Sequence, residues 1–221
     1  MKCKSCIPCL AATKTNSSEP LNTSEMPEYT FQHVSLDFAG PFPNGKHLLV
    51  LTDEYSRFPV VKIINSTSSK TVILKLDSIF SEFRICEFLK SDNGPPMNGH
   101  DFAQFANYMG FKHRRITPLL PQANGECERF MRSIGKAIRA SHAQGTSWKQ
   151  DMYSYLRNYR ATPHASTNIS PAELFYERSI NIKIPSVQIP SKGDKHKKAR
   201  QSDKKAKQKK MKSYADTRRN A

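Results

Sequence analysis

The chain has 221 residues, of which 37% are hydrophobic and 10% aromatic, which suffices for one core of ordinary domain size with additional tails. Its formal net charge of +16 favours a polyanionic partner, and nucleic acid is commoner than an anionic membrane when no apolar anchor accompanies the charge. No run approaches the roughly 18 apolar residues that a membrane span needs, so we expect an intracellular protein that does not contact a membrane.

The amino-terminal segment carries three closely spaced cysteines, Cys3, Cys6 and Cys9, of the five in the chain. An odd number with this spacing suits a reduced compartment and metal ligation better than a disulfide framework. Residues 13–28 follow, and their polar composition with two prolines is typical of a linker. We therefore expect ordered structure to begin near Tyr29.

Hydrophobic periodicity predicts the elements of the next part of the chain. Residues 29–38 alternate, with Phe31 out of phase, and predict a strand that places Asp37 on its polar side. Two further strands, over 47–55 and 58–65, would complete an antiparallel meander. After them we expect a helix over 69–83, a strand over 84–92, a helix over 99–111 that ends at Gly110, a strand over 112–117, and helices over 121–140 and 147–164.

This order predicts an α/β fold with one mixed five-stranded sheet flanked by helices. Apolar residues at helical spacing predict which helix faces are buried. In chain order these faces are Ile73, Leu76, Phe80 and Phe83; Phe102, Phe105, Ala106 and Met109; Phe130, Ile134, Ala137 and Ile138; and Trp148, Met152, Tyr155, Leu156 and Tyr159.

The carboxyl-terminal residues 192–221 hold thirteen Lys or Arg against three Asp, so +10 of the net charge lies there. From about Pro190 the chain is low in apolar residues, and we expect it to be disordered when free. Such a tail would add salt-sensitive affinity for nucleic acid and serve as a nuclear address. A solvated extension without a specific role is an equal alternative.

Three acidic residues could form a metal site. Asp37 lies on the first strand, Asp92 ends the fourth, and Glu128 opens a helix, so neighbouring strands would bring them together. Converging carboxylates repel one another at low dielectric, and such a cluster persists mainly when divalent cations neutralise it. Oxygen ligands favour Mg²⁺ or Mn²⁺, and two such ions about 3.5–4 Å apart can promote phosphoryl transfer. Taken singly, each acid would more often be a turn, cap or helix-dipole residue.

Basic residues share the helix face of Glu128. Arg132 and Lys136 follow it by four and eight positions, where they could hold a DNA phosphate beside the metals. A surface ion pair with Glu128 would explain Arg132 but not Lys136. Glu126 and Glu128 lie about 200° apart on a helix, so only one can join the cluster, and spacing does not decide which.

Four motifs then occur in order: HVSLDFAGPFPNGKHLLVLTDEYSRFPVV from His33, KSDNGPP from Lys90, PQANGECERF from Pro121 and NYRATPHASTNISPAEL from Asn158. Together they resemble the integrase core of retroviruses and long-terminal-repeat retrotransposons, and gypsy-type elements most closely. The resemblance runs from about residue 3 to residue 219. It implies a ribonuclease H-like fold, with metal-binding catalytic roles for Asp37, Asp92 and Glu128, and so selects Glu128 over Glu126.

The resemblance also assigns roles outside the triad. Gln122 and Asn124 match family positions that approach DNA. Cys6 and Cys9 match the cysteine pair of the family's zinc module, but no histidines precede them, so Zn²⁺ would bind only in a longer form. The implied domains are 1–12, the truncated end of the zinc module; 13–28, a linker; 29–185, the catalytic core; and 186–221, a basic tail. Leu120 and Glu177 depart from the family's usual His and Gly.

The resemblance implies an integrase that trims the DNA ends of a mobile element and joins them to target DNA with Mg²⁺ or Mn²⁺. It also implies a homo-oligomer that acts in the nucleus after import from the cytoplasm. One alternative is a catalytically inactive, domesticated nucleic-acid-binding protein, against which the three retained carboxylates argue. Another is a cut-and-paste transposase or a ribonuclease, and the motif from Asn158 favours an integrase over both.

Overall fold

The computed structural model describes residues 26–116, 125–183, 201–206 and 208–209. The chain divides into two compact units, of which one is formed by Met26–Ala206 and the other by Met1–Glu25 with Lys207–Ala221. All the strands and helices whose bounds are given below belong to the unit Met26–Ala206.

Five strands form one mixed sheet in the order β3-β2-β1-β4-β5. Strands β1, β2 and β3 make an antiparallel meander, and β4 and β5 run parallel to β1. The predicted α/β class and the mixed five-stranded sheet are confirmed. The strand bounds are β1 His33–Ala39, β2 His47–Asp53, β3 Pro59–Ile64, β4 Phe88–Ser91 and β5 Lys112–Arg115.

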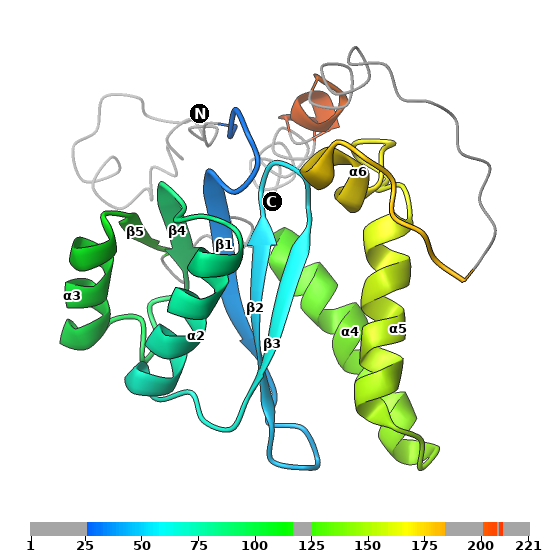
Figure 1. Cartoon of the computed structure of the whole chain (residues 1–221), viewed down its shortest axis with the longest axis horizontal. Helices are drawn as coiled ribbons and strands as arrows, with labels where there is room; N and C mark the ends of the chain where they lie inside the picture. Colours follow the sequence, from blue (N-terminus) through cyan, green and yellow to red (C-terminus); the bar gives the residue numbers. More distant parts are fainter. Residues whose placement is uncertain (1–25, 117–124, 184–200, 207, 210–221) are drawn as a thin grey trace, which may run out of the picture. The chain divides into compact units, whose positions relative to one another are not determined.

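Helices cover both faces of the sheet (Figure 1). Helices α2 (Ser69–Glu82) and α3 (His100–Met109) lie on one side, and α4 (Gly125–Ala143) and α5 (Trp148–Ala161) lie on the other. Gly110 ends α3 in the left-handed conformation, with φ 79°, as the sequence predicts.

The short helix α6 (Pro171–Tyr176) was not among the predicted elements. The oxygen of the Ser170 side chain accepts a hydrogen bond from the backbone N–H of Glu173, and Pro171 occupies the first turn. Ser-Pro-Ala-Glu is therefore an amino-terminal cap signal that could have identified this helix.

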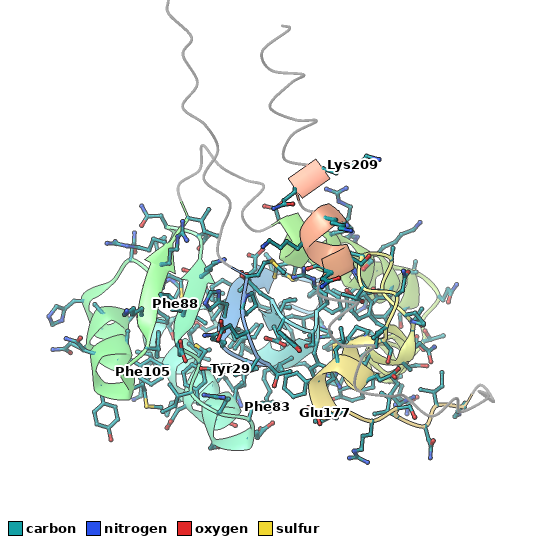
Figure 2. All side chains as sticks on the ribbon, turned by 90° about the horizontal axis from the view of Figure 1, so that it is seen from above. Tyr29, Phe83, Phe88, Phe105, Glu177 and Lys209 are labelled. Carbon is teal, nitrogen blue, oxygen red and sulfur yellow. The ribbon has the colours of Figure 1, made fainter. Side chains whose placement is uncertain are left out.

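The larger apolar core lies between the sheet and helices α2 and α3. Val34 and Leu36 of β1 point into it, and the Phe80, Phe102, Phe105 and Phe111 rings pack there edge-to-face and stacked. Phe83 and Phe105 mark this side of the sheet in Figure 2. Since each buried aromatic ring removes a large apolar area from water, this core supplies much of the hydrophobic stabilisation.

Two expectations about this core need correction. The buried stripe of α2 consists of Val72, Leu76, Ile79 and Phe80, so it is rotated from the predicted face, and Ile73 and Phe83 are only partly buried. Strand β1 begins at His33, and Phe31 lies before it with φ 62° and 1% exposure. The turn at Phe31 delivers that ring to the core, which explains why it breaks the alternation of the strand.

The second apolar cluster lies between the sheet and helices α4 and α5. Leu48 and Val50 of β2 contact it, while the intervening Leu49 and Leu51 point to the larger core. Strand β2 is therefore buried on both faces. The predicted faces of α4 and α5 are confirmed for the fully buried Phe130, Ile134, Ile138, Met152 and Leu156, whereas Ala137, Trp148, Tyr155 and Tyr159 are partly buried.

Arg160, in the fourth motif, serves the fold. Its Nη2 and Nε atoms donate to the Pro59 carbonyl oxygen at 2.8 and 3.2 Å, and its guanidinium lies 4.5 Å from the centroid of the Phe58 ring. These contacts tie the end of α5 to the start of β3. Burial lowers the pKa of Arg160 because desolvation disfavours the charged form.

Part of the basic tail is described. Residues 201–206 are helical, and the buried Asp203 forms an ion pair with the buried Arg57 of the β2–β3 turn. Residues 184–200, 207 and 210–221 lie outside the described residues. Within the described ranges, no helix combines the length and apolar character that a membrane crossing requires.

Candidate active site

Asp37 lies near the end of β1 on the face that α4 covers, opposite Val50 of β2 in the strand register. Its Oδ1 atom accepts a hydrogen bond from the Phe38 backbone N–H at 2.7 Å. Burial raises the pKa of Asp37, and the negative charges of Asp92 and Glu128 raise it further, against the opposing effect of the Phe38 hydrogen bond. The effect of these two charges indicates that both acids lie in the neighbourhood of Asp37.

A cavity of about 390 Å³ joins Asp37 to Glu128. One wall is the end of β1 with the start of the β1–β2 turn, residues 37–43. The other is the face of α4 that carries Glu128, Met131, Arg132, Gly135 and Arg139. The acids, far apart in the sequence, thus share a pocket with two guanidinium groups. Such a pocket can hold an anion beside a carboxylate pair.

The β1–β2 turn depends on Gly40, which has φ 120°. A Cβ atom at Gly40 would lie 2.9 Å from the Lys46 carbonyl oxygen, closer than a side chain can approach. The Phe42 N–H donates to that same oxygen at 2.9 Å and closes the hairpin. Glycine therefore allows the turn to fold tightly against the pocket.

Asp92 directly follows β4. Lys90 is the register partner of Ser35, and Asp92 and Asp37 come two residues after these partners, so both lie at the same end of the β1–β4 pair. Asp92 is not part of the cavity lining, and its proximity to Asp37 rests on its effect on the pKa of that residue. A Cβ atom at Gly94 would lie 3.2 Å from the Asp92 Oδ2 atom, so the loop folds back closely on this carboxylate.

Among the described residues, no group of three or more Asp, Glu, His or Cys side chains is gathered as a metal site. Asp37 and Glu128 both line the cavity. The proximity of Asp92 is indicated by its negative charge, which raises the pKa of Asp37. The chemistry of the donors nevertheless fits Mg²⁺ or Mn²⁺, because all three are carboxylates and their charges already disfavour ionised Asp37. The metal-binding triad remains a prediction.

The predicted DNA-binding residues divide into three groups. Arg132 lines the cavity, as its spacing from Glu128 suggests. Lys136 is exposed on α4 but does not line the cavity. Gln122 and Asn124, together with the proposed zinc ligands Cys6 and Cys9, lie outside the described residues, as does the side chain of Glu126.

Sequence reasoning missed Arg139. It follows Glu128 by eleven positions, or about three helical turns, so it shares the same helix face. Its Nη1 atom lies 3.4 Å from where a Cβ atom of Gly135 would be, so the guanidinium folds over this glycine toward the cavity. Extending the helical spacing by one more turn beyond Lys136 would have found it.

The family described as "Integrase core domain" matches residues 28–121. The chain is 35% identical over 176 residues to the "Uncharacterized protein K02A2.6" of Caenorhabditis elegans, a match that covers 79% of this chain. It is 25% identical over 169 residues to the "Retrovirus-related Pol polyprotein from transposon 412" of Drosophila melanogaster, covering 74% of this chain. In each case the chain spans 14% of the relative's length.

Solved structures share the fold. The catalytic core domain of BIV integrase has a TM-score of 0.55 with 19% identity and covers 66% of this chain and 95% of its own. The HTLV-2 integrase catalytic core domain, in complex with magnesium and in a trimeric form, has a TM-score of 0.55 with 14% identity and covers 66% and 97%. These likenesses confirm the ribonuclease H-like fold. The family match over residues 28–121, together with the relatives, identifies this part of the chain as an integrase core of the retroviral and LTR-retrotransposon type.

Proposed function

We propose that this chain carries the catalytic centre of a mobile-element integrase, which cleaves phosphodiester bonds at the element's DNA ends and joins those ends to target DNA. The observation that carries the proposal is the cavity that unites Asp37 and Glu128 with Arg132 and Arg139. Carboxylates beside guanidinium groups are what a polynucleotidyl transferase needs to act on a phosphate.

Asp37, Asp92 and Glu128 would hold divalent cations, Mg²⁺ or Mn²⁺. The magnesium in the HTLV-2 integrase core, which has a similar fold, supports this choice. When bound, such ions neutralise the phosphate and activate the attacking oxygen, whether it belongs to water or to a DNA 3′ hydroxyl.

The residues of the chain itself would bind and orient the DNA. Arg132 and Arg139 would each contact a phosphate, and their planar guanidinium groups can do so through two parallel hydrogen bonds. Phe38, Phe42 and Met131 line the same cavity. These apolar side chains would exclude water around the phosphate and so strengthen its attraction to the two arginines.

The proposal extends to partners and location. DNA would be bound both as the element's ends and as the target, and the trimeric form of the HTLV-2 core supports self-association. The Lys-rich tail would add affinity for any DNA sequence. Because the substrate would be chromosomal, the protein would act in the nucleus after import from the cytoplasm. The alternative, an inactive domesticated protein, is not favoured, since the three acids are all present.

The test is Mg²⁺-dependent nicking of a labelled DNA duplex by the whole chain and by its Glu128→Gln variant. We expect the variant to lose nicking, because one ligand and one negative charge are removed, while its affinity for DNA stays within about twofold of the original. Glu177→Gln is the matched control, since Glu177 is an exposed glutamate after α6. Nicking that survives in Glu128→Gln at the control's rate would rule out this assignment.

A further inference from the structure

A buried ion pair lies on the face of the sheet that bears Asp37. Glu54 follows β2, and its Oε2 atom lies 2.7 Å from the Nζ atom of Lys90 in β4. Its Oε1 atom accepts a hydrogen bond from the Ser35 hydroxyl, also at 2.7 Å. Ser35 and Lys90 are 5% exposed and Glu54 is 7% exposed. Removing two charges from water is costly, so a buried pair is weak evidence for stability and invites a functional explanation.

The strand register places this pair next to the proposed metal ligands. Ser35 and Lys90 are partners in the parallel β1–β4 pairing. Asp37 comes two residues after Ser35 in β1 and extends toward the same face, because side chains alternate along a strand. Asp92 comes two residues after Lys90, directly beyond the end of β4. Lys90 is therefore two residues from Asp92 along the chain, and its register partner Ser35 is two residues from Asp37.

Cys127 of α4 contacts the same face of the sheet. Its sulfur accepts a hydrogen bond from the Thr52 hydroxyl at 3.6 Å. Burial raises the pKa of Cys127 to about 12, and the charges of Asp37, Glu128 and Glu54 add to this effect. The Cys127 thiol is therefore influenced by the charges of two predicted metal ligands, Asp37 and Glu128, and also by that of Glu54.

A lysine so close to a metal site is a potential competitor. Its ammonium is a compact charge with three donors on a flexible stem. Residues two apart on a strand are separated by about 6.6–6.8 Å, which a lysine side chain can span. Without Glu54, the neighbouring carboxylates available to Lys90 would include Asp92 and Asp37, and the ammonium would neutralise the oxygens that a divalent cation requires.

We propose that Glu54 is a positioning residue that holds Lys90 away from Asp37 and Asp92, and so keeps these carboxylates available for a divalent cation. The Ser35 hydroxyl assists by fixing the second oxygen of Glu54. This inference rests on the proposed function, because it assumes that the aspartates bind metal. The buried Glu54–Lys90 pair would then influence the affinity for metal without being a metal ligand itself.

The experiment measures Mn²⁺ binding to the whole chain by electron paramagnetic resonance, without DNA and without turnover. Glu54→Gln releases Lys90, and we expect Mn²⁺ affinity to fall about tenfold, a change typical of one nearby charge. Adding Lys90→Met to Glu54→Gln removes the competitor, and affinity should return to within about twofold of the original protein, since replacing both members of a buried pair is often tolerated. Circular dichroism verifies that each variant is folded.

The outcomes separate the two proposals. Unchanged Mn²⁺ affinity in a folded Glu54→Gln variant would overturn the role of Glu54, as would an equal loss in the single and double variants. If Glu54→Gln does not fold, Ser35→Ala weakens the same hold without removing a charge; a smaller loss of affinity then supports the proposal, and no loss overturns it. Asp37→Asn tests the underlying function, because Mn²⁺ binding that survives there would refute the metal site whatever Glu54 does.

Discussion

The two faces of the sheet carry different kinds of side chain, although both are built from alternate residues of the same strands. On the face toward α2 and α3, Leu36 and its neighbours are buried among aromatic rings. On the face toward α4, the next residue of the strand is Asp37, and behind it lie the buried charges of Glu54 and Lys90. Because successive side chains of a strand point to opposite faces, one strand places stabilising residues on one face and candidate catalytic residues on the other. Substitutions on the two faces should have correspondingly different consequences.

Leu76→Ala, on the apolar face, should have the largest effect on stability. Leu76 is fully buried in α2, and removing its side chain should lower the free energy of unfolding by about 2–5 kcal/mol through lost burial and a residual cavity. Urea denaturation measures this change. Nicking per folded molecule should stay the same, and a specific loss of nicking would show that the two faces are not separate in function.

Arg160→Ala should cost less, about 1–3 kcal/mol, because it removes two hydrogen bonds to the Pro59 carbonyl and the contact with the Phe58 ring. The same denaturation measures it. Arg178→Ala is a suitable control, since Arg178 is exposed and its guanidinium lies 5.9 Å from the Tyr176 ring centroid. Equal stability of the two variants would contradict a structural role for Arg160 in the fourth motif.

Asp37→Asn should raise stability while it abolishes nicking. The folded state disfavours ionised Asp37, so the stability linked to this group is fully present below its ordinary pKa of 3.8 and is lost as the pH rises through the raised folded pKa. With EDTA present, the variant should therefore be the more stable protein at neutral pH, and the difference should vanish in acid. Urea denaturation across this pH range tests the sign, and a less stable variant at pH 7 would contradict it.

Arg139→Ala should have the smallest effect. It would weaken DNA binding uniformly across sequences and reduce the slope of log K against log salt by about 1, as the loss of one phosphate contact does. Fluorescence anisotropy over a salt series measures both. Lys75→Ala, an exposed cation of α2 on the other side of the sheet, is the control. Identical slopes for the two variants would remove Arg139 from the DNA-binding surface.

The sequence was most informative where local patterns determine structure. Alternation along β1 identified both the buried Leu36 and the polar side that bears Asp37, because side-chain direction in a strand follows directly from position. The stripe of α2 was predicted with the wrong rotation, since its apolar residues span a wide arc and only packing decides which are buried. Glu128 was chosen over Glu126 by a motif, because helical spacing excludes neither.

The parts that depend on tertiary contacts could not be predicted. Nothing in the local pattern indicates that Glu54, Lys90 and Ser35 meet, because they come from three segments that only the sheet register brings together. Helical spacing alone could have placed Arg139 on the same face as Glu128. That this face borders a cavity depends on the position of the β1–β2 turn, which the sequence does not reveal. Charge composition alone likewise could not predict the buried ion pair of Asp203 with Arg57.

Calorimetric titration of Mg²⁺ into the chain and into its Asp37→Asn, Asp92→Asn and Glu128→Gln variants tests the central claim most directly. If the three carboxylates form one site, each single change should weaken Mg²⁺ binding at least tenfold, because each would remove a ligand and a charge. The account would be contradicted if any one variant bound Mg²⁺ with unchanged affinity and stoichiometry, since that carboxylate would then lie outside the site.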